Sequence, residues 1–449
     1  MKYDSIFSSA MRSVRAQEHL YNEIALKNTE KVISAFRKNQ VSDYYMKPTT
    51  GYAYADMGRD KLDDIYADIF HTEAALVRSQ FVSGTHALAV AMLGNLRPGD
   101  EVIGATGTPY DTMQTIIGYP VKTPGSLVDL GIVYKEIPMT ERYIDSKAVC
   151  QAITPATKMV HIQRSCGYSA LRDTLDVASI GDLIQAVHTI RPDIICFVDN
   201  CYGEFTELLE PTDVGADLMA GSLIKNPGGG LAPTGGYIVG KEACVYNAAC
   251  RLTAPGLAGE MGATLGDTAR EFYQGLFMAP HVVMQAVKTA IYAAAVFSKL
   301  GYEVKPAPDQ IRHDIIQAIT LNSSTNLENF CVAIQVNSPV DAYVVPEPAN
   351  IPGYQDKIIM AAGTFVQGAS IELSADGPMR EPYNVFMQGG LTFEHGQLAI
   401  NAAAEMIGPA KKSRKRRGDV IIKNESCIDV IEKVEAIVEK YGLEKEDLN

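Results

Sequence analysis

The residues Ile194-Ile195-Cys196-Phe197-Val198-Asp199-Asn200 form an apolar run that ends in an acid, as a strand buried in a parallel sheet does. About one strand-and-helix unit later comes Gly221-Ser222-Leu223-Ile224-Lys225-Asn226-Pro227, followed by three glycines. An acid at the carboxyl end of a strand, followed by a lysine after a short apolar run, suits a pyridoxal-phosphate site. There the lysine forms a Schiff base, and the acid keeps the pyridinium nitrogen protonated. We therefore predict that Lys225 and Asp199 are catalytic and hold this cofactor.

Short apolar runs alternate with helical patterns from residue 74 to about residue 240, and Gly and Pro residues separate them. This alternation is expected of a mostly parallel, mixed sheet covered by helices, so the predicted fold class is α/β. The runs predicted to be strands are Ala75–Phe81, Glu101–Ala105, Met159–Gln163, Ile194–Val198 and Gly236–Val239.

Helical spacing of apolar residues predicts an arm over residues 12–40, an amphipathic helix over Leu62–Phe70 and a long apolar helix over 281–300. Beyond it we expect a smaller α+β domain with strands at Cys331–Val336 and Ser370–Leu373. The predicted parts are a helical arm (1–50), a large cofactor-binding domain (51–280), a bridging helix with the small domain (281–408) and a tail (409–449).

The predicted tail differs in composition from the rest of the chain. A basic run covers Lys411–Arg417, and apolar residues from Ile428 to Tyr441 line one face of a predicted helix with Ser426 as its N-cap. Such a run is most often a solvated linker, and contact with nucleic acid or acidic lipid is the sharper alternative.

Composition limits the classes of function. The 449 residues carry a net charge of -13, which argues against a nucleic-acid surface over the body of the protein. No run of about 18 apolar residues predicts a membrane span, and the N-terminus lacks the apolar core of a signal peptide. The eight cysteines have no CxxC spacing, so we expect a reducing cytoplasm, no disulfides and no metal site.

Ser83-Gly84-Thr85 follows a predicted strand and opens an apolar helix. A strand, a turn of small residues and a helix N-terminus form a phosphate cradle, because backbone N–H groups and the helix dipole face the anion. Ser222, three residues before the lysine, is a further donor to the phosphate. Apolar neighbours around Lys225 indicate burial, which would lower its pKa.

Two further residues are candidates by position. The chain has no Trp, so Tyr110, in a loop after a predicted strand, is the candidate to stack on the pyridine ring. A substrate carboxylate favours a bidentate guanidinium, and Arg380 is the candidate, although Arg164 and Arg59 suit the role equally well.

Taken together, these residues resemble the fold-type-I pyridoxal-phosphate enzymes of trans-sulfuration, the cystathionine and methionine γ-lyase family. They are most similar to its divergent branch associated with aluminium resistance. The resemblance covers roughly residues 10–407. The stretches that carry it are Glu73–Val77, Leu96–Ile103, His161–Ser165, Val198–Gly203, Gly221–Lys225 and Met387–Thr392.

The resemblance implies a homotetramer built from dimers, in which each active site borrows residues from its neighbour. It implies that Lys225 forms the Schiff base and moves protons, and that Asp199 pairs with the pyridinium nitrogen. Tyr110 would stack on the ring, while Ser222 and the backbone at residues 84–85 would bind the phosphate.

Two departures from the family pattern concern the phosphate. Ile224 stands where family lyases carry a hydroxyl, and Tyr52-Ala53-Tyr54 stands where the neighbour's Tyr-x-Arg clamp is expected. Tyr52 and Tyr54 remain candidate cofactor ligands, and Arg59 is the candidate replacement for the missing arginine.

The predicted function is a cytoplasmic carbon–sulfur lyase acting on a sulfur-containing L-amino acid such as methionine, cystathionine or cysteine. Loss of a β- or γ-substituent would yield a thiol, ammonia and a 2-oxo acid. The same lysine and aspartate would also serve a racemase, an aldolase or a decarboxylase. A third hypothesis is a metal-tolerance or regulatory protein that binds partners through its acidic surface or its tail.

Overall fold

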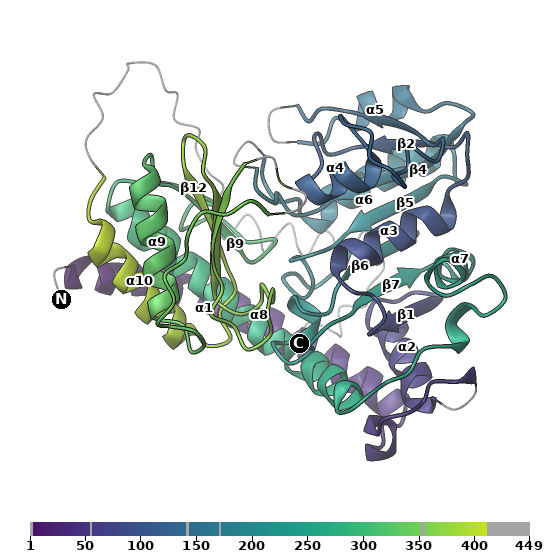
Figure 1. Cartoon of the computed structure of the whole chain (residues 1–449), viewed down its shortest axis with the longest axis horizontal. Coiled ribbons are helices and arrows are strands. Elements are labelled where there is room, and N and C mark those ends of the chain that lie inside the picture. Colours follow the sequence, from purple (N-terminus) through teal and green to yellow (C-terminus); the bar gives the residue numbers. More distant parts are fainter. Residues whose placement is uncertain are drawn as a thin grey trace.

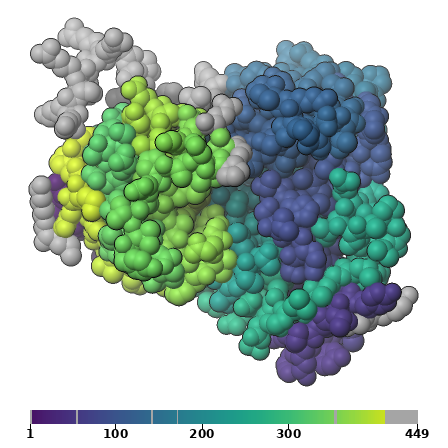
Figure 2. Space-filling view, in the orientation of Figure 1, coloured from purple at the N-terminus to yellow at the C-terminus, as the bar shows by residue number. Residues whose placement is uncertain are grey.

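The computed structural model describes residues 3–53, 56–140, 143–169, 172–351, 354 and 356–410. The basic run and the helix predicted for the tail lie outside these residues. Two sheets organise the chain, one in each of two lobes, and long helices join the lobes along one side (Figure 1). Figure 2 shows the C-terminal lobe, coloured green to yellow, packed beside the blue and teal lobe.

The larger sheet confirms the predicted α/β class. Its strand order is β1-β7-β6-β5-β4-β2-β3, with β7 antiparallel to both neighbours and the other pairs parallel. All five predicted strands of this region are present, with ends shifted by a few residues. The strands are β1 (Ala74–Arg78), β2 (Glu101–Gly104), β3 (Val133–Glu136), β4 (Thr157–Gln163), β5 (Ile195–Asp199), β6 (Leu218–Ser222) and β7 (Gly236–Gly240).

Helices surround this sheet, as the alternating pattern predicts (Figure 1). Strands β5, β6 and β7 are buried over their whole lengths, which requires cover on both faces. The helices of this part are α2 (Met57–Ile69), α3 (Gly84–Asn95), α4 (Asp111–Ile117), α5 (Ser146–Ala152), α6 (Val177–Ile190) and α7 (Glu242–Leu252), and the short 3-10 turns are η1 (Asp43–Met46), η3 (Asn226–Gly228) and η4 (Ala258–Glu260).

Two long helices connect the lobes. α1 (Asp4–Lys38) buries a stripe of residues at helical spacing, from Phe7 to Ala35, and packs along α8 (Thr268–Lys299). α8 begins earlier than the predicted 281, so the predicted domain boundary at 280/281 falls inside it. By length and composition α8 could cross a membrane, but 78% of its most apolar window is buried inside the protein, as in a core helix.

The smaller sheet is wholly antiparallel, in the order β10-β11-β12-β9-β8. Helices α9 and α10 pack on each other, and α9 packs on three of its strands. The elements are β8 (Glu303–Lys305), β9 (Ile316–Thr320), α9 (Ser324–Val336), β10 (Ile358–Ala361), β11 (Ser374–Pro378), β12 (Asn384–Gln388) and α10 (Phe393–Ile407).

Two strand predictions in this lobe are wrong. Cys331–Val336 is the last part of α9, whose start is fixed by Ser323, the N-cap that accepts a hydrogen bond from the Asn326 amide. The stretch Ser370–Leu373 precedes β11 instead of forming it. There the Glu372 carboxylate accepts hydrogen bonds from the amides of Phe365 and Val366, which closes a loop.

Candidate active site

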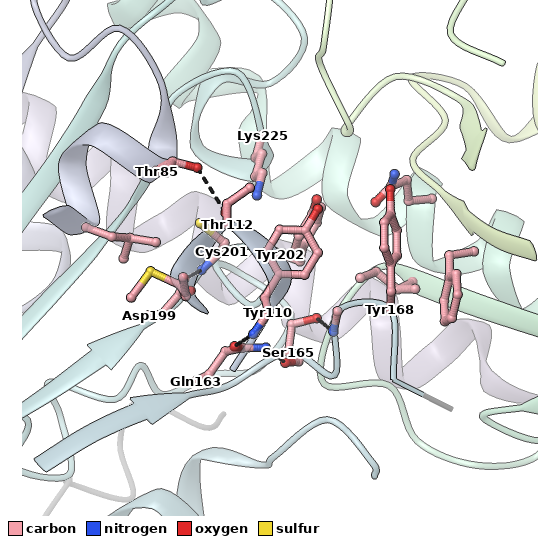
Figure 3. A pocket seen from close by; sticks show the side chains of 16 residues that line it. Thr85, Tyr110, Thr112, Gln163, Ser165, Tyr168, Asp199, Cys201, Tyr202 and Lys225 are labelled. Carbon is pink, nitrogen blue, oxygen red and sulfur yellow. Dashed lines mark hydrogen bonds between the residues drawn. The ribbon is translucent and has the colours of Figure 1, made fainter. Parts of the chain in front are cut away.

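A pocket of about 570 Å³, partly open to solvent, lies between the lobes at the carboxyl ends of β4, β5 and β6 (Figure 3). Parallel α/β sheets place their binding sites at this edge. Its lining residues are Thr85, Leu88, Tyr110, Thr112, Met113, Gln163, Ser165, Gly167, Tyr168, Asp199, Cys201, Tyr202, Lys225, Ile316, Phe386 and Gln388. Four of the site residues predicted from the sequence therefore meet here: Thr85, Tyr110, Asp199 and Lys225.

Lys225 follows β6 directly and enters the pocket, where its Nζ lies 3.8 Å from the centre of the Tyr202 ring. Burial acts to lower the pKa of Lys225, but Cys201, Tyr202 and Asp199 outweigh it and raise that pKa above the ordinary lysine value. The prediction of a lowered pKa is therefore wrong, because it considered burial without the acidic groups that the fold brings to the amine.

Asp199 ends β5 and lines the same pocket while only 7% exposed. One carboxylate oxygen, Oδ1, accepts a hydrogen bond of 3.1 Å from the backbone amide of Cys201, which fixes the orientation of the side chain. The Cys201 thiol is a further hydrogen-bond partner of this carboxylate, which lines the pocket. A buried acid held in this orientation suits a protonated ring nitrogen.

A histidine on β4, His161, interacts electrostatically with Asp199, and no role was assigned to it from the sequence. His161 is 1% exposed, and its Nε2 has no hydrogen-bond partner within the described part of the chain. Burial lowers the pKa of His161 to about 4, although the Asp199 charge acts in the opposite direction. His161 is therefore neutral at physiological pH and places no positive charge beside the Asp199 carboxylate.

The turn predicted to hold a phosphate lies at the N-terminus of α3, against β6. Gly84 lies so close to β6 that a Cβ added to it would stand 2.8 Å from Ser222 Cβ. The Ser222 Oγ is buried, and no hydrogen-bond partner for it exists among the described residues. An orphan hydroxyl beside a helix N-terminus and the Thr85 hydroxyl fits a phosphate group.

The Ser83 hydroxyl has a different task. It accepts a 3.1 Å hydrogen bond from the His86 amide as the N-cap of α3, and Ser83 is absent from the pocket lining. Ser83 thus shapes the cradle through the helix start, whereas Thr85 faces the pocket and lies 3.3 Å from the Thr112 hydroxyl.

Tyr110 forms part of an aromatic wall. Its amide donates a 2.8 Å hydrogen bond to Gln163 Oε1, which holds the residue at the start of α4. Its ring lies edge-on to Tyr168 at 5.4 Å and to Tyr354 at 6.0 Å, and its hydroxyl is hydrogen-bonded to that of Tyr354. Burial raises the pKa of Tyr110 well above its usual value, so the phenol is neutral.

The three candidate arginines lie outside the pocket lining. Arg380 is exposed at the surface and paired with Asp356 at 2.7 Å. Arg164 is fully buried, and its guanidinium is paired with Glu207 and Glu210. These pairs make Arg164 a structural residue, and the only cation among the described lining residues is Lys225.

Arg59 and Tyr52 do not line the pocket. Arg59 donates to the carbonyls of Gly51 and Ala53 and so holds the loop that carries Tyr52. Tyr52 is 71% exposed and does not line the pocket of its own chain. Tyr54 lies outside the described residues.

The pocket contains residues that the sequence interpretation missed, above all Tyr168, Tyr202 and Gln388. Tyr202 and Gln388 lie within stretches that carry the family resemblance, which was the available signal. Tyr168 gives no such signal, since its position depends on contacts with the smaller sheet.

Comparison with known proteins gives a consistent result. A family model described as methionine gamma-lyase matches residues 3–408. An uncharacterized protein of Bacillus subtilis (strain 168) is 51% identical over 391 residues, 86% of this chain and 91% of that protein. An L-methionine gamma-lyase of Pseudomonas deceptionensis is 25% identical over 289 residues, 62% of this chain and 63% of that protein.

Solved structures agree. A carbon-sulfur lyase involved in aluminum resistance from Clostridium novyi has a TM-score of 0.85 at 46% identity, covering 90% of this chain and 95% of that chain. A cystathionine gamma-lyase from Lactobacillus plantarum has a TM-score of 0.54 at 18% identity, covering 78% of this chain and 86% of that chain, and is similar in fold.

Proposed function

Because the chain belongs to the methionine gamma-lyase family, we propose that it is a pyridoxal-phosphate-dependent carbon–sulfur lyase acting on a sulfur-containing L-amino acid. Its fold is that of the fold-type-I enzymes. The observation that carries the proposal is the meeting of the Lys225 amine and the Asp199 carboxylate in one pocket, with the orphan Ser222 hydroxyl nearby on β6, against Gly84 at the N-terminus of α3.

The residues present fit the cofactor. Ser222, Thr85 and the backbone at Gly84 would hold the phosphate, and the Asp199 carboxylate would pair with the ring nitrogen. Tyr110 would stack against the ring. When bound, pyridoxal phosphate supplies an aldehyde that condenses with amines and a ring that withdraws electrons from the substrate Cα.

Lys225 has two tasks in this proposal. Its Nζ is the only amine among the described lining residues, so it is the atom that would bond to the cofactor. Once free, the same Nζ would be the group that accepts the Cα proton of the substrate. The Tyr202 ring, 3.8 Å from Nζ, holds the amine in place for this step. The Asp199 carboxylate, beside His161, would pair with the ring nitrogen and so favour its protonated form.

Elimination of a β- or γ-substituent then gives a thiol, ammonia and a 2-oxo acid. A product assay across methionine, cystathionine and cysteine tests this directly. We expect thiol and 2-oxo acid to appear together from at least one of them, and Lys225→Ala to abolish both. Release of carbon dioxide or of the D-amino acid, without thiol, would instead indicate a decarboxylase or a racemase.

We further propose a cytoplasmic homotetramer in which Tyr52 reaches the pocket of a neighbouring subunit. What supports this is the position of Tyr52, which is 71% exposed and held by the Arg59 contacts to its loop, yet does not line its own pocket. Sedimentation of the purified protein tests the assembly; a monomer in solution would contradict it.

A further inference from the structure

The wall of the pocket that faces the cofactor residues comes from the smaller sheet and contains a buried acid. Asp376 on β11 is 7% exposed, and its cross-strand neighbour Phe386 lines the pocket. Gln388, two residues further along β12, and Tyr168, whose ring packs 5.0 Å from that of Phe386, line it as well.

Tyr168 and Gln388 both direct a hydrogen at the Asp376 carboxylate. The Tyr168 hydroxyl donates to Oδ2, and Gln388 Nε2 donates to Oδ1 at 3.0 Å. These two hydrogen bonds decide which atoms remain for a ligand. A phenol has only one hydrogen, and the Gln388 amide oxygen points away from the amide nitrogen that donates to Asp376. What the pair has left for the pocket is therefore Gln388 Oε1, for which no protein donor is found among the described residues, and one lone pair of the Tyr168 oxygen, which also lies within hydrogen-bonding reach of the Tyr354 hydroxyl.

The negative charge of Asp376 and the acceptor oxygens beside it favour the same kind of ligand group. Burial raises the pKa of Asp376 to about 6, against the opposing effects of the hydrogen bonds from Tyr168 and Gln388 and of the Lys225 charge. Lys225 is the amine proposed to bond to the cofactor, and it then no longer carries a free ammonium charge. A buried acid without a cation is costly, so this wall is complementary to a positively charged donor supplied by the ligand.

We propose that Asp376, Tyr168 and Gln388 form a subsite for an ammonium group on the substrate side chain. The inference rests on the proposed function and narrows it. The preferred substrates are thioether amino acids with a cationic side-chain end, ahead of those with an apolar end such as methionine. An anionic end is disfavoured most, because it would face the carboxylate of Asp376 and two acceptor oxygens.

Three cysteine derivatives of nearly equal length test the preference in the holoenzyme. S-(2-aminoethyl)-L-cysteine and S-propyl-L-cysteine have the same shape and differ in charge, and S-(2-carboxyethyl)-L-cysteine carries the opposite charge. We expect kcat/KM for pyruvate release to be at least about tenfold higher for the aminoethyl than for the propyl compound, since a hydrogen bond to a charged group contributes that much. Equal values, or a preference for the propyl compound, would overturn the proposal.

Asp376→Asn keeps the shape of the side chain and removes its charge. In this variant the ratio of kcat/KM for the aminoethyl compound to kcat/KM for the propyl compound should fall to near one. Gln388→Met removes the acceptor oxygen and provides a second test if Asp376→Asn does not fold. Ser374→Ala changes a neutral residue on the same face of β11 and should leave the ratio unchanged. A ratio that survives both Asp376→Asn and Gln388→Met would show that the cluster is only structural.

A binding measurement separates this proposal from the lyase activity. L-Ornithine and L-norleucine match in length but differ in charge, and neither contains a carbon–sulfur bond. Calorimetry should give at least about tenfold tighter binding of ornithine to the holoenzyme, and Asp376→Asn should remove the difference. If none of the three thioethers is cleaved but ornithine is preferred, the lyase proposal fails and the subsite stands; if cleavage occurs without any preference for the cationic ligands, the reverse holds.

Discussion

Replacing Ser222 by Ala should change the cofactor-free protein and the loaded protein in opposite directions. Ser222 is 1% exposed, and its Oγ has no hydrogen-bond partner among the described residues. The hydroxyl has therefore lost its contact with water without gaining a hydrogen bond in the protein. An unpaired buried hydroxyl costs about 1–3 kcal/mol, and the Ala variant avoids this cost. We therefore expect Ser222→Ala to raise the melting temperature of the cofactor-free protein.

In the loaded protein the same hydroxyl is proposed to bind the phosphate. A hydrogen bond to a charged group contributes about 1.5–3 kcal/mol, so the Ala variant should bind pyridoxal phosphate about tenfold to a hundredfold more weakly. Absorbance titration of the cofactor-free protein measures the affinity, and thermal denaturation with and without cofactor measures the stability.

Ser374→Ala is the matched control for this experiment. The Ser374 Oγ is also buried without a partner in the part of the chain that the structure describes, but Ser374 lies on β11 of the smaller sheet, whereas Ser222 lies against Gly84 at the N-terminus of α3. It should stabilise the protein in the same way and leave the cofactor affinity unchanged. Our interpretation of the cradle would be refuted if Ser222→Ala bound the cofactor as tightly as the wild type, or if both variants weakened it equally.

Three further changes have defined outcomes. Burial raises the pKa of Glu204 from 4.5 to about 8, so the contribution of Glu204 to stability is fully present below pH 4.5 and is lost as pH rises through 8. The melting temperature of Glu204→Gln should therefore exceed that of the wild type by an amount that grows across this pH range. A difference that stays constant with pH would contradict this expectation. Arg164→Met leaves the buried Glu210 without its arginine partner and leaves the half-buried Glu207 with only His313, so it should cost about 3–5 kcal/mol, seen as a large fall in melting temperature in a chemically unchanged pocket. An unchanged melting temperature would argue against these ion pairs. Tyr52→Ala should weaken cofactor binding severalfold without lowering the stability of the cofactor-free protein, whereas unchanged affinity would rule out a role in a neighbouring pocket.

The large sheet could be predicted from the sequence because its strands are buried on both faces. Runs such as Ile194–Val198 are apolar at every position, and this pattern differs clearly from that of an amphipathic helix. Cys331–Val336 has the same β-branched and apolar composition, yet it ends a helix. The N-cap at Ser323 and the spacing of Leu327, Phe330 and Ile334 along one face outweigh local strand propensity.

The candidate site likewise contains some residues whose positions could be predicted from the sequence and others whose positions could not. Asp199, Ser222 and Lys225 come from neighbouring strands within one short segment, so their meeting follows from the predicted topology. Tyr168 and Asp376 are separated by 208 positions, and only the packing of the two lobes brings them together. The pKa of Lys225 could not be predicted either, because its direction depends on which acids surround the amine once the chain is folded.

The central claim is that Lys225 bonds covalently to pyridoxal phosphate. The measurement that tests it most directly is the visible absorption spectrum of the purified protein before and after borohydride, followed by mapping of the modified peptide. We predict a yellow protein whose visible band disappears on reduction, with the pyridoxyl group fixed to Lys225. A protein that stays colourless with added pyridoxal phosphate, or a label on another lysine, would contradict this account.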